Sequence, residues 1–175
     1  MLQKGLIRLI TSPFSYLILL VKKQDRTQTF CMDYHALNVI MIKDHFPIPT
    51  IDELLDELGG EGGRGASWFY KLDLLQGCHQ IQMHKDDVYK NVFHTHHGHY
   101  EFKVMPIDLC NALSSFQVTM NVIFRPYLHH FIIIFFDDIL IYNRTLEDHL
   151  IHLEKAFEVL LNGQFILKFL KCFFA

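Results

Sequence analysis

Two short apolar runs separated by two carboxylates form the strongest pattern in the chain. Residues 131–136 and 139–142 are rich in Ile and Phe, which is typical of buried strands. Asp137 and Asp138 lie between them and predict the turn of a hairpin. Tight hairpin turns favour Asn-Gly or Asp-Gly, however, and adjacent carboxylates repel each other. The pattern therefore leaves two interpretations, a solvated acidic turn or a divalent-metal site, and a third carboxylate would favour the second.

The third carboxylate is found in an earlier strand pattern. Residues 67–75 alternate between polar and apolar positions, and Asp73 stands near the end of that segment. Taken alone, Asp73 would be an ordinary residue at a strand end. Beside the hairpin it would place three carboxylates at one sheet edge, and oxygen ligands on a rigid sheet suit Mg²⁺. Two such ions about 4 Å apart can clamp the attacking and leaving oxygens of a phosphoryl transfer.

The rest of the chain alternates between strand and helix patterns. Further strands are expected at 17–21, 29–34, 79–83, 92–95, 100–104 and 165–172. Helices are expected after Thr50, over 111–124 and after Thr145, where Thr50 with Glu53 and Thr145 with Asp148 form capping pairs. The apolar stripe expected to bury the last helix consists of Leu146, Leu150, Leu153, Phe157 and Leu160. This order predicts an α+β chain with an antiparallel sheet backed by helices.

Three other motifs suggest chemistry but favour simpler interpretations. The glycine-rich segment 61–65 has neither of the common phosphate-loop spacings, so we expect a flexible insert. Four histidines at 94, 96, 97 and 99 alternate between strand faces, so we expect a solvated hairpin tip rather than a metal site. His149 and His152 have no third ligand in the pattern and are expected at the surface.

Composition and charge narrow the function only slightly. The 175 residues suffice for one domain or two small lobes, and 50% are hydrophobic, which excludes a disordered chain. The four cysteines are scattered without a CxxC pair, which disfavours zinc and fits reduced, intracellular thiols. No apolar run approaches the roughly 20 residues of a membrane span, and we expect no membrane partner. The net charge of −3 gives no overall nucleic-acid signature, but Lys22 and Lys23 form a basic tip that could meet a triphosphate.

Numerous ordered motifs resemble one enzyme family over almost the whole chain. The chain is similar to the reverse transcriptase of gypsy-type LTR retrotransposons. The motifs that carry this resemblance are Ser12-Pro13-Phe14-Ser15, Val21-Lys22-Lys23, Phe30-Cys31-Met32-Asp33-Tyr34, Ala36-Leu37-Asn38, Phe46-Pro47-Ile48-Pro49-Thr50-Ile51-Asp52-Glu53-Leu54, Lys71-Leu72-Asp73-Leu74, His79-Gln80-Ile81, Gly98-His99-Tyr100-Glu101-Phe102 and Phe135-Phe136-Asp137-Asp138-Ile139-Leu140.

The resemblance implies a fold and a reaction. The fold would be a right-hand polymerase palm with a fingers subdomain, with fingers at about 1–42 and 81–111 and palm at about 43–80 and 112–175. The reaction would be addition of dNTPs to a primer 3′-hydroxyl on an RNA or DNA template, with Mg²⁺ or Mn²⁺ as cofactor. The thumb, connection and ribonuclease H regions of the family would follow Ala175 and are missing from this sequence. The family implies an intracellular location, in a cytoplasmic particle.

The family's functional residues transfer to matching positions in this chain. Asp73, Asp137 and Asp138 resemble the catalytic metal-binding triad, and Leu74 would offer its backbone carbonyl to a metal. The nucleotide pocket would include Lys23, which meets the triphosphate, the positions of Cys78 and Asp108, and Gln117 beside the primer–template.

Several positions depart from the family pattern, and the departures concentrate at the nucleotide pocket. Thr29 replaces an Arg that packs on the triphosphate, and Cys78 replaces an aromatic residue that excludes ribonucleotides. Asp108 replaces Gly, and Leu113 replaces Pro. Because changes such as Gly to Asp and Pro to Leu each need one transition, we expect a decayed copy with impaired activity. The alternatives are a remnant that at most binds nucleic acid weakly, and a palm-type cyclase or phosphohydrolase, which no further motif supports.

Overall fold

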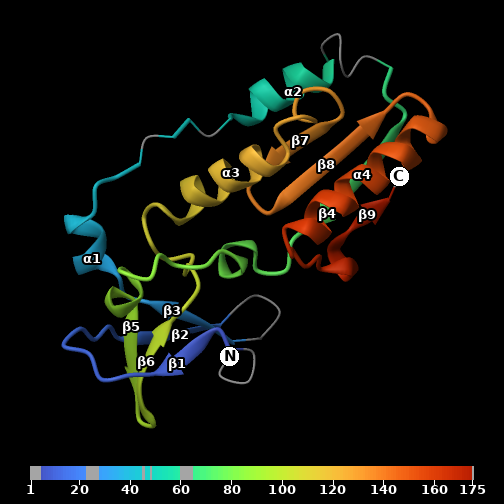
Figure 1. Ribbon diagram of the computed structural model, residues 1–175. Helices are drawn as coiled ribbons and strands as arrows, with labels where there is room; N and C mark the ends of the chain where they lie inside the picture. The colour runs from blue at the N-terminus through green and yellow to red at the C-terminus, as the bar shows by residue number, and fades with distance from the viewer. Residues whose placement is uncertain (1–4, 23–27, 45, 48, 60–64, 175) are drawn as a thin grey trace. The chain divides into compact units, whose positions relative to one another are not determined.

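The computed structural model describes residues 5–22, 28–44, 46–47, 49–59 and 65–174. The chain divides into two compact units, each built from two separate stretches (Figure 1). The first unit consists of residues 1–44 and 78–112, and the second of residues 45–77 and 113–175. Both combine antiparallel strands with helices, so the α+β expectation is confirmed. No helix among the described residues has the length and apolar character needed to cross a lipid bilayer.

The first unit contains a three-stranded antiparallel sheet and a separate hairpin. The sheet has the order β1-β6-β5, with β1 at Ile7–Leu9, β6 at Gly98–Phe102 and β5 at Val92–Thr95. The hairpin joins β2 (Ile18–Lys22) to β3 (Gln28–Met32), and helix α1 (His35–Ile40) follows. The hairpin was predicted, whereas β1 and α1 were not.

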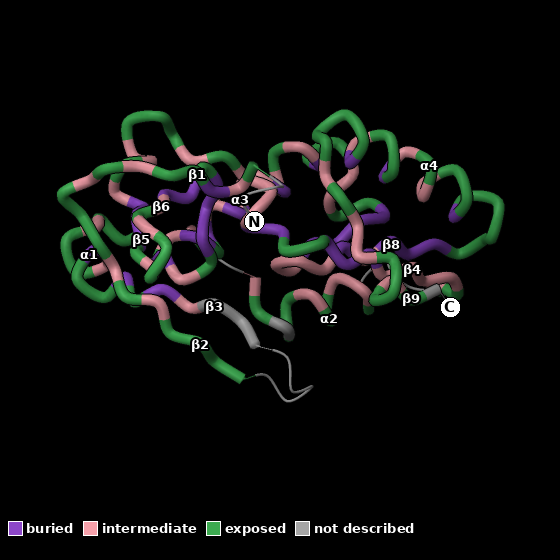
Figure 2. The backbone as a smooth tube through the Cα atoms, turned by 90° about the horizontal axis from the view of Figure 1, so that it is seen from below, coloured by how far each residue is buried: buried purple, intermediate pink, exposed green. Residues whose placement is uncertain are grey.

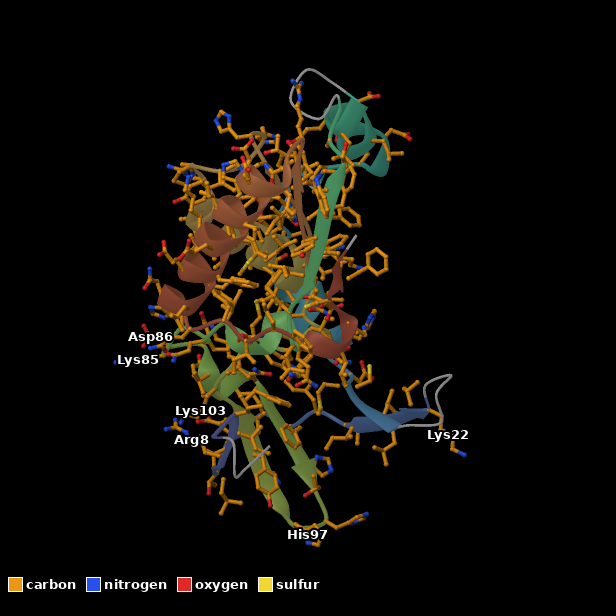
Figure 3. All side chains as sticks on the ribbon, turned by 90° about the vertical axis from the view of Figure 1, so that its right-hand side faces the viewer. Arg8, Lys22, Lys85, Asp86, His97 and Lys103 are labelled. Carbon is orange, nitrogen blue, oxygen red and sulfur yellow. The ribbon has the colours of Figure 1, made fainter. Side chains whose placement is uncertain are left out.

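Burial in the first unit is uneven (Figure 2). Val92, Phe93 and Phe102 are buried in the three-stranded sheet, while most of β2 is exposed although every residue before Lys22 is apolar. Figure 3 shows Lys22 at the end of β2 and His97 at the tip of the β5–β6 hairpin. The four histidines of that tip are all exposed, as predicted.

The second unit is built on a four-stranded antiparallel sheet with the order β7-β8-β4-β9. Three helices, α2 (Ile51–Gly59), α3 (Ala112–Ile123) and α4 (Leu146–Asn162), accompany it, and α4 packs on β8 and β4. The strands are β4 (Trp68–Asp73), β7 (Ile132–Phe135), β8 (Asp138–Asn143) and β9 (Phe173–Phe174). The centre is apolar and fully buried, with Leu72, Ile139 and Ile141 from the sheet and Phe116 and Met120 from α3.

The predicted helix caps are present in this unit. Thr50 Oγ1 accepts from the Glu53 N–H at 3.3 Å, and the Glu53 carboxylate accepts from the Thr50 N–H at 2.7 Å. Thr145 Oγ1 accepts from the Asp148 N–H at 3.1 Å. Each cap satisfies backbone donors that the first helical turn leaves unpaired, which explains why these helices begin where the sequence predicts.

Two predicted strands are wrong. The chain forms a 3₁₀ turn at Gly77–Gln80, and only Gln82 makes an isolated bridge within the expected strand 79–83. Gln76 has a φ of 53°, so the backbone leaves the extended conformation directly after β4. In the expected strand 165–172, Leu167 makes a single bridge and a 3₁₀ turn occupies Phe169–Lys171. Alternation of side chains alone could not reveal these turns.

The predicted burial of α4 is confirmed for Leu160 but wrong for three of the five stripe residues. His149 is fully buried together with Ala156 and Leu160, while three residues of the expected stripe, Leu146, Leu150 and Phe157, are 42%, 53% and 40% exposed. The His149 ring packs edge-on against Tyr70 and its Nδ1 lies 2.9 Å from the Asn143 side-chain oxygen. The sheet selects a face of α4 that carries a polar residue because β8 supplies Asn143 as its partner.

His152 lies one turn along α4 and is half-buried rather than at the surface as expected. Its ring stacks on Phe131 at a centroid distance of 3.7 Å. Burial lowers the pKa of both His149 and His152, so each favours the neutral imidazole.

Candidate active site

The pairing of β4 with β8 brings two of the three predicted carboxylates together. Asp73, the last residue of β4, is the register partner of Asp138, the first residue of β8. Asp138 also pairs with Phe135 across the β7–β8 hairpin. The turn residues are therefore Phe136 and Asp137, and the expectation that both aspartates form the turn is wrong. Phe136 has a φ of 52°, a left-handed conformation that a two-residue hairpin turn requires.

Asp137 is held against the end of β4. The Leu74 N–H donates to the Asp137 backbone oxygen at 3.1 Å, while the Leu74 side chain is buried. The Asp137 carboxyl group is partly buried, and its Oδ1 atom has no hydrogen-bond partner among the described residues. Burial raises the pKa of this carboxyl group, and the charges of Asp73 and Asp138 raise it further, while Lys171 opposes them. A cation near this oxygen would favour the charged carboxylate and thus oppose both effects on its pKa.

Gly77 leaves the space that the Asp137 side chain occupies. A Cβ atom at this position would lie 2.4 Å from Asp137 Oδ1 and 2.7 Å from the Phe116 ring. Any side chain would therefore displace the carboxylate or the ring beneath it. Sequence reasoning missed Gly77 as part of the site. Its place directly after the strand that ends in Asp73 was the available signal.

Two lysines that were not predicted at the site contact the other two carboxylates. Lys71 Nζ lies 2.8 Å from Asp138 Oδ2, and Lys171 Nζ lies 3.7 Å from Asp73 Oδ2. Lys71 stands two residues before Asp73 on β4, so the two side chains share a face of the sheet. That spacing could have identified Lys71, whereas Lys171 is almost a hundred positions from Asp73 in the chain and has no such local signal.

These residues have the right chemistry for a divalent cation, but their side chains are not gathered around one. Carboxylate oxygens and a backbone carbonyl are ligands that Mg²⁺ prefers, and the unpartnered Asp137 Oδ1 is a buried acceptor of that type. Within the described ranges, no group of three or more His, Cys, Asp or Glu side chains is arranged to hold a metal ion. The donor set therefore fits Mg²⁺ or Mn²⁺, with lysines at two of its three carboxylates.

Gln117 supports the site from α3 and is almost completely buried. Its Nε2 donates to the Ile134 carbonyl and to Asn121 Oδ1, both at 3.0 Å, and its Oε1 accepts from the Phe136 N–H at 3.0 Å. The amide thus joins α3 to the strand and turn that precede Asp137. All three of these hydrogen bonds are made within the second unit.

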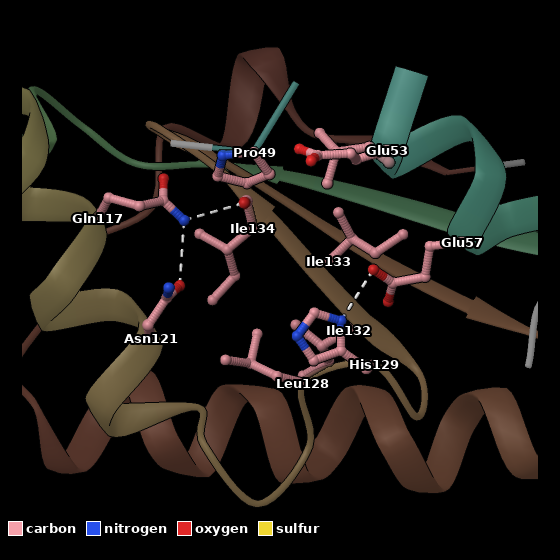
Figure 4. A pocket seen from close by; sticks show the side chains of 11 residues that line it. Pro49, Glu53, Glu57, Gln117, Asn121, Leu128, His129, Ile132, Ile133 and Ile134 are labelled. Carbon is pink, nitrogen blue, oxygen red and sulfur yellow. Dashed lines mark hydrogen bonds and ion pairs between the residues drawn. The ribbon is translucent and has the colours of Figure 1, made fainter. Parts of the chain in front are cut away.

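A pocket of about 250 Å³ lies beside Gln117, between α2, α3 and β7 (Figure 4). Its apolar wall includes Ile132 and Ile133, and Glu57 on α2 pairs with His129 at 2.8 Å. None of the three triad carboxylates lines this pocket. Its lining includes aliphatic side chains together with the carboxylates of Glu53 and Glu57.

Among the predicted nucleotide-binding residues of the first unit, Asp108 is hydrogen-bonded within the protein. The Asp108 carboxylate accepts from the Met32 N–H at 2.9 Å and from the Cys31 thiol at 3.3 Å. That hydrogen bond and burial raise the pKa of Cys31. Cys78 is buried, and Lys23 lies outside the described residues. Asp108 therefore joins the end of β3 to the segment before α3.

Comparison with known proteins identifies relatives across the whole chain. The family profile described as "Reverse transcriptase (RNA-dependent DNA polymerase)" matches residues 21–175. The chain is 38% identical over 179 aligned residues to a retrovirus-related Pol polyprotein from transposon 297 of Drosophila melanogaster, covering 99% of this chain and 16% of that protein. It is 41% identical over 126 residues to an RNA-directed DNA polymerase homolog of Oenothera berteroana, covering 70% of this chain and 85% of that protein. The chain thus spans only a small part of the polyprotein.

Solved structures show the same fold at lower sequence identity. A foamy viral protease-reverse transcriptase in complex with double-stranded DNA matches with a TM-score of 0.88 and 22% identity, covering 99% of this chain and 29% of that chain. The same type of protein in complex with an RNA/DNA hybrid matches with a TM-score of 0.86, also at 22% identity, covering 99% of this chain and 22% of that chain.

Proposed function

Because the chain belongs to the reverse transcriptase (RNA-dependent DNA polymerase) family, we propose that it forms the fingers and palm of a gypsy-type LTR retrotransposon polymerase. The first compact unit, 1–44 and 78–112, corresponds to the fingers, and the second, 45–77 and 113–175, to the palm. Relatives in transposon polyproteins support a retrotransposon origin. In a complete enzyme, a thumb, connection and ribonuclease H region would act with this part.

The proposed reaction joins a dNTP to a primer 3′-hydroxyl and releases pyrophosphate. Asp73, Asp137 and Asp138 would hold Mg²⁺ or Mn²⁺ together with the Leu74 carbonyl, and Lys23 would contact the triphosphate. When bound, the metal stabilises charge on the attacking and leaving oxygens. The residues of this chain position the ligands: the β4–β8 pairing sets Asp73 beside Asp138, and Gln117 and Gly77 fix the turn with Asp137.

The observation that carries the proposal is the register pairing of Asp73 with Asp138 beside the unpartnered oxygen of Asp137. Three carboxylates at one sheet edge repel each other, and the pKa of Asp137 is raised first by burial and then by the charges of Asp73 and Asp138. Such an arrangement is costly for stability and useful for binding a divalent cation. An RNA or DNA template with primer is the proposed partner, supported by structural neighbours that were solved with double-stranded DNA and with an RNA/DNA hybrid.

Primer extension tests the proposal. The chain with the three family residues restored (Thr29→Arg, Asp108→Gly and Leu113→Pro) is joined to a thumb from a related polymerase and incubated with primed RNA or DNA, dNTPs and Mg²⁺. Extension that requires Mg²⁺ and disappears in Asp137→Asn supports a polymerase. Metal-independent extension, or equal extension by the variant, contradicts the assigned triad.

A second candidate is a catalytically inactive remnant that at most binds nucleic acid weakly. The observation that favours it is Asp108, whose carboxylate stands where the family has glycine and is held by the Met32 N–H. Thr29 supplies no positive charge at the position of the family arginine. Absence of extension both with and without the three restored residues, with retained binding to primed template in a gel-shift assay, would select this candidate.

A further inference from the structure

Each of two carboxylates in the triad faces a lysine. Lys71 Nζ lies 2.8 Å from Asp138 Oδ2, and Lys171 Nζ lies 3.7 Å from Asp73 Oδ2. The third carboxylate, Asp137, has an oxygen without a partner among the described residues. Two positive charges therefore stand against three negative ones within a few residues of the sheet edge.

Lys71 is fixed to the site by strand pairing. It lies within β4 and pairs in register with Leu140, which is two residues after Asp138 on β8. Its side chain therefore reaches Asp138 diagonally across the strand pair, a separation that long side chains span. The backbone of Lys71 cannot shift without breaking the β4–β8 ladder, so only the side chain can leave Asp138.

Lys171 is fixed to the site by a different element. It ends the 3₁₀ turn Phe169–Lys171, and the preceding Lys168 N–H donates to the Asp73 backbone oxygen at 2.7 Å. The segment that carries Lys171 is thus tied to the same residue that its ammonium group faces. Both lysines are attached to the backbone that sets the carboxylates, which distinguishes them from chance pairs of surface side chains.

An ammonium group and a divalent cation compete for the same carboxylate oxygens. The described part of the chain contains no three-ligand metal group, although the backbone brings Asp73 and Asp138 into register. We infer that Lys71 and Lys171 are internal counter-ions of the triad, which a divalent cation displaces from Asp138 and Asp73 as it binds. This inference rests on the proposed function of the triad as the metal site. The two lysines then lower the affinity for the metal and stabilise the protein without it.

The opposite role would be that of a positioning group that orients the carboxylates for the metal. The two roles predict opposite changes in metal affinity when the charge of Lys71 is removed: the counter-ion role predicts a gain and the positioning role a loss. Lys71→Met removes the ammonium group and keeps most of the alkyl chain. Because no positive charge then competes for Asp138, the counter-ion role predicts tighter metal binding. The side chains of Lys71 and Asp138 are 42% and 41% exposed. An ion pair of that exposure is weak, so the expected gain is about two- to fivefold. Lys71→Arg keeps the charge and should bind the metal no more tightly than the wild type.

The test measures Mn²⁺ binding directly, using the electron paramagnetic resonance signal of free Mn²⁺ at constant ionic strength. A parallel series records the melting temperature against Mg²⁺ concentration for the same proteins. Lys71→Met should lower the Mn²⁺ dissociation constant and move the Mg²⁺ response to lower concentration, and Lys171→Met should do the same more weakly. Lys155→Met, a change on α4, is the matched control and should leave Mn²⁺ binding unchanged.

Three results would overturn the inference, and they differ from one another. Unchanged or weaker Mn²⁺ binding by Lys71→Met, with loss of binding in Asp137→Asn, overturns the counter-ion role alone. If Lys71→Met and Lys155→Met tightened Mn²⁺ binding equally, the effect would be one of overall protein charge and the counter-ion role would fail. Equal Mn²⁺ binding by the wild type and Asp137→Asn removes the triad as the metal site, and the proposed function and this inference then fail together.

Discussion

The Phe136 N–H donates to Gln117 Oε1 at 3.0 Å, and this bond fastens the turn before Asp137 to a helix. The same amide donates to the Ile134 carbonyl, so one buried side chain pairs a backbone acceptor at the end of β7 and a backbone donor in the turn that follows. Without these two hydrogen bonds, the turn at the sheet edge would be held to α3 less firmly. Gln117 converts it into a fixed support for a carboxylate.

Replacing Gln117 with Leu should destabilise the second unit and loosen the site. The change leaves the Phe136 N–H and the Ile134 carbonyl without partners in a buried place, which costs about 1–3 kcal/mol for each such group. We expect a loss of about 2–4 kcal/mol in the free energy of unfolding, measured by urea denaturation. Asn121→Ala is the control: it removes only the outer hydrogen bond of the amide and should cost much less. Equal losses in both variants would contradict the support of the turn by Gln117.

Gly77→Ala should displace the Asp137 carboxylate. The added Cβ would meet Asp137 Oδ1 at 2.4 Å and the Phe116 ring at 2.7 Å, and overpacking of this kind costs about 1–3 kcal/mol. We expect a lower melting temperature together with a smaller stabilisation by Mg²⁺. Gly59→Ala is the matched control, because a Cβ at the end of α2 has no neighbour within 4 Å. A Mg²⁺ response that survives intact in Gly77→Ala would show that the carboxylate need not occupy this place.

Asp137→Asn should stabilise the metal-free protein near pH 7. The folded-state pKa of Asp137 is raised above the ordinary value of about 3.9, so the folded protein holds this proton more tightly than the unfolded chain. The stability contribution of the group therefore falls as pH rises from about 3.9 through the raised folded-state pKa. Asparagine removes that penalty, and urea unfolding at pH 7 and pH 4 should show the larger gain at pH 7.

The same variant tests the metal. Mg²⁺ should raise the melting temperature of the wild type by mass action and raise that of Asp137→Asn much less. Asp56→Asn, an exposed change on α2, serves as the control and should keep the full response. If Asp137→Asn stabilised the metal-free protein equally at pH 7 and pH 4, the result would contradict the raised folded-state pKa of Asp137.

His149 should make the protein sensitive to mild acid. Its folded-state pKa is lowered from the ordinary value of about 6.5, so the unfolded chain gains a proton first as pH falls. Stability is then complete above about pH 6.5 and is lost as pH falls toward the lowered folded-state pKa. His149→Gln should flatten the dependence of the unfolding free energy between pH 7 and pH 5, whereas His97→Gln at the exposed hairpin tip should leave it unchanged. Parallel curves for the wild type and His149→Gln would contradict this assignment.

Asp108→Gly alone should not restore polymerase activity. The carboxylate holds the Met32 N–H at 2.9 Å, so its removal should cost about 1–2 kcal/mol in the first unit. The family pattern also calls for Thr29→Arg and for Leu113→Pro in the first turn of α3, where proline is well tolerated.

The matched experiment compares four proteins on one appended family thumb: the wild type, Asp108→Gly, the three changes together, and the three changes with Asp137→Asn. Primer extension should appear only with the three changes and an intact triad. Robust extension by the wild type would contradict the expected decay of the nucleotide pocket.

Local signals account for what the sequence predicted well. The Thr50–Glu53 and Thr145–Asp148 caps depend on residues three apart, and the strands that end in Asp73 and begin at Asp138 have strong apolar patterns. These features are decided within a few residues. The expectation for the turn failed by one position because the left-handed conformation falls on Phe136, a residue that the pattern assigned to a strand.

The remaining features depend on contacts between distant segments. The Lys171–Asp73 pair is set by the assembled sheet, and no local pattern encodes it. The close approach of Asp137 and Phe116 to Gly77 also depends on that assembly, and the only local signal for Gly77 is its place shortly after the strand that ends in Asp73. His149 was expected at the surface because the sequence offers no third ligand beside it and His152, and the stripe that includes Leu146, Leu150 and Phe157 was expected to be buried. The sheet instead buries the face that carries His149, since Asn143 on β8 completes its hydrogen bond.

The hairpin of β2 and β3 shares no strand ladder with the three-stranded sheet in the part of the chain that the structure describes. A ladder of only two strands with an exposed face opens at a small free-energy cost compared with a central strand. Amide protons of β2 and β3 should therefore exchange with deuterium far faster than those of β8, which is paired on both sides. We therefore expect the hairpin that carries Lys22 to open and re-form many times while the β4–β8 ladder that carries Asp73 and Asp138 stays paired.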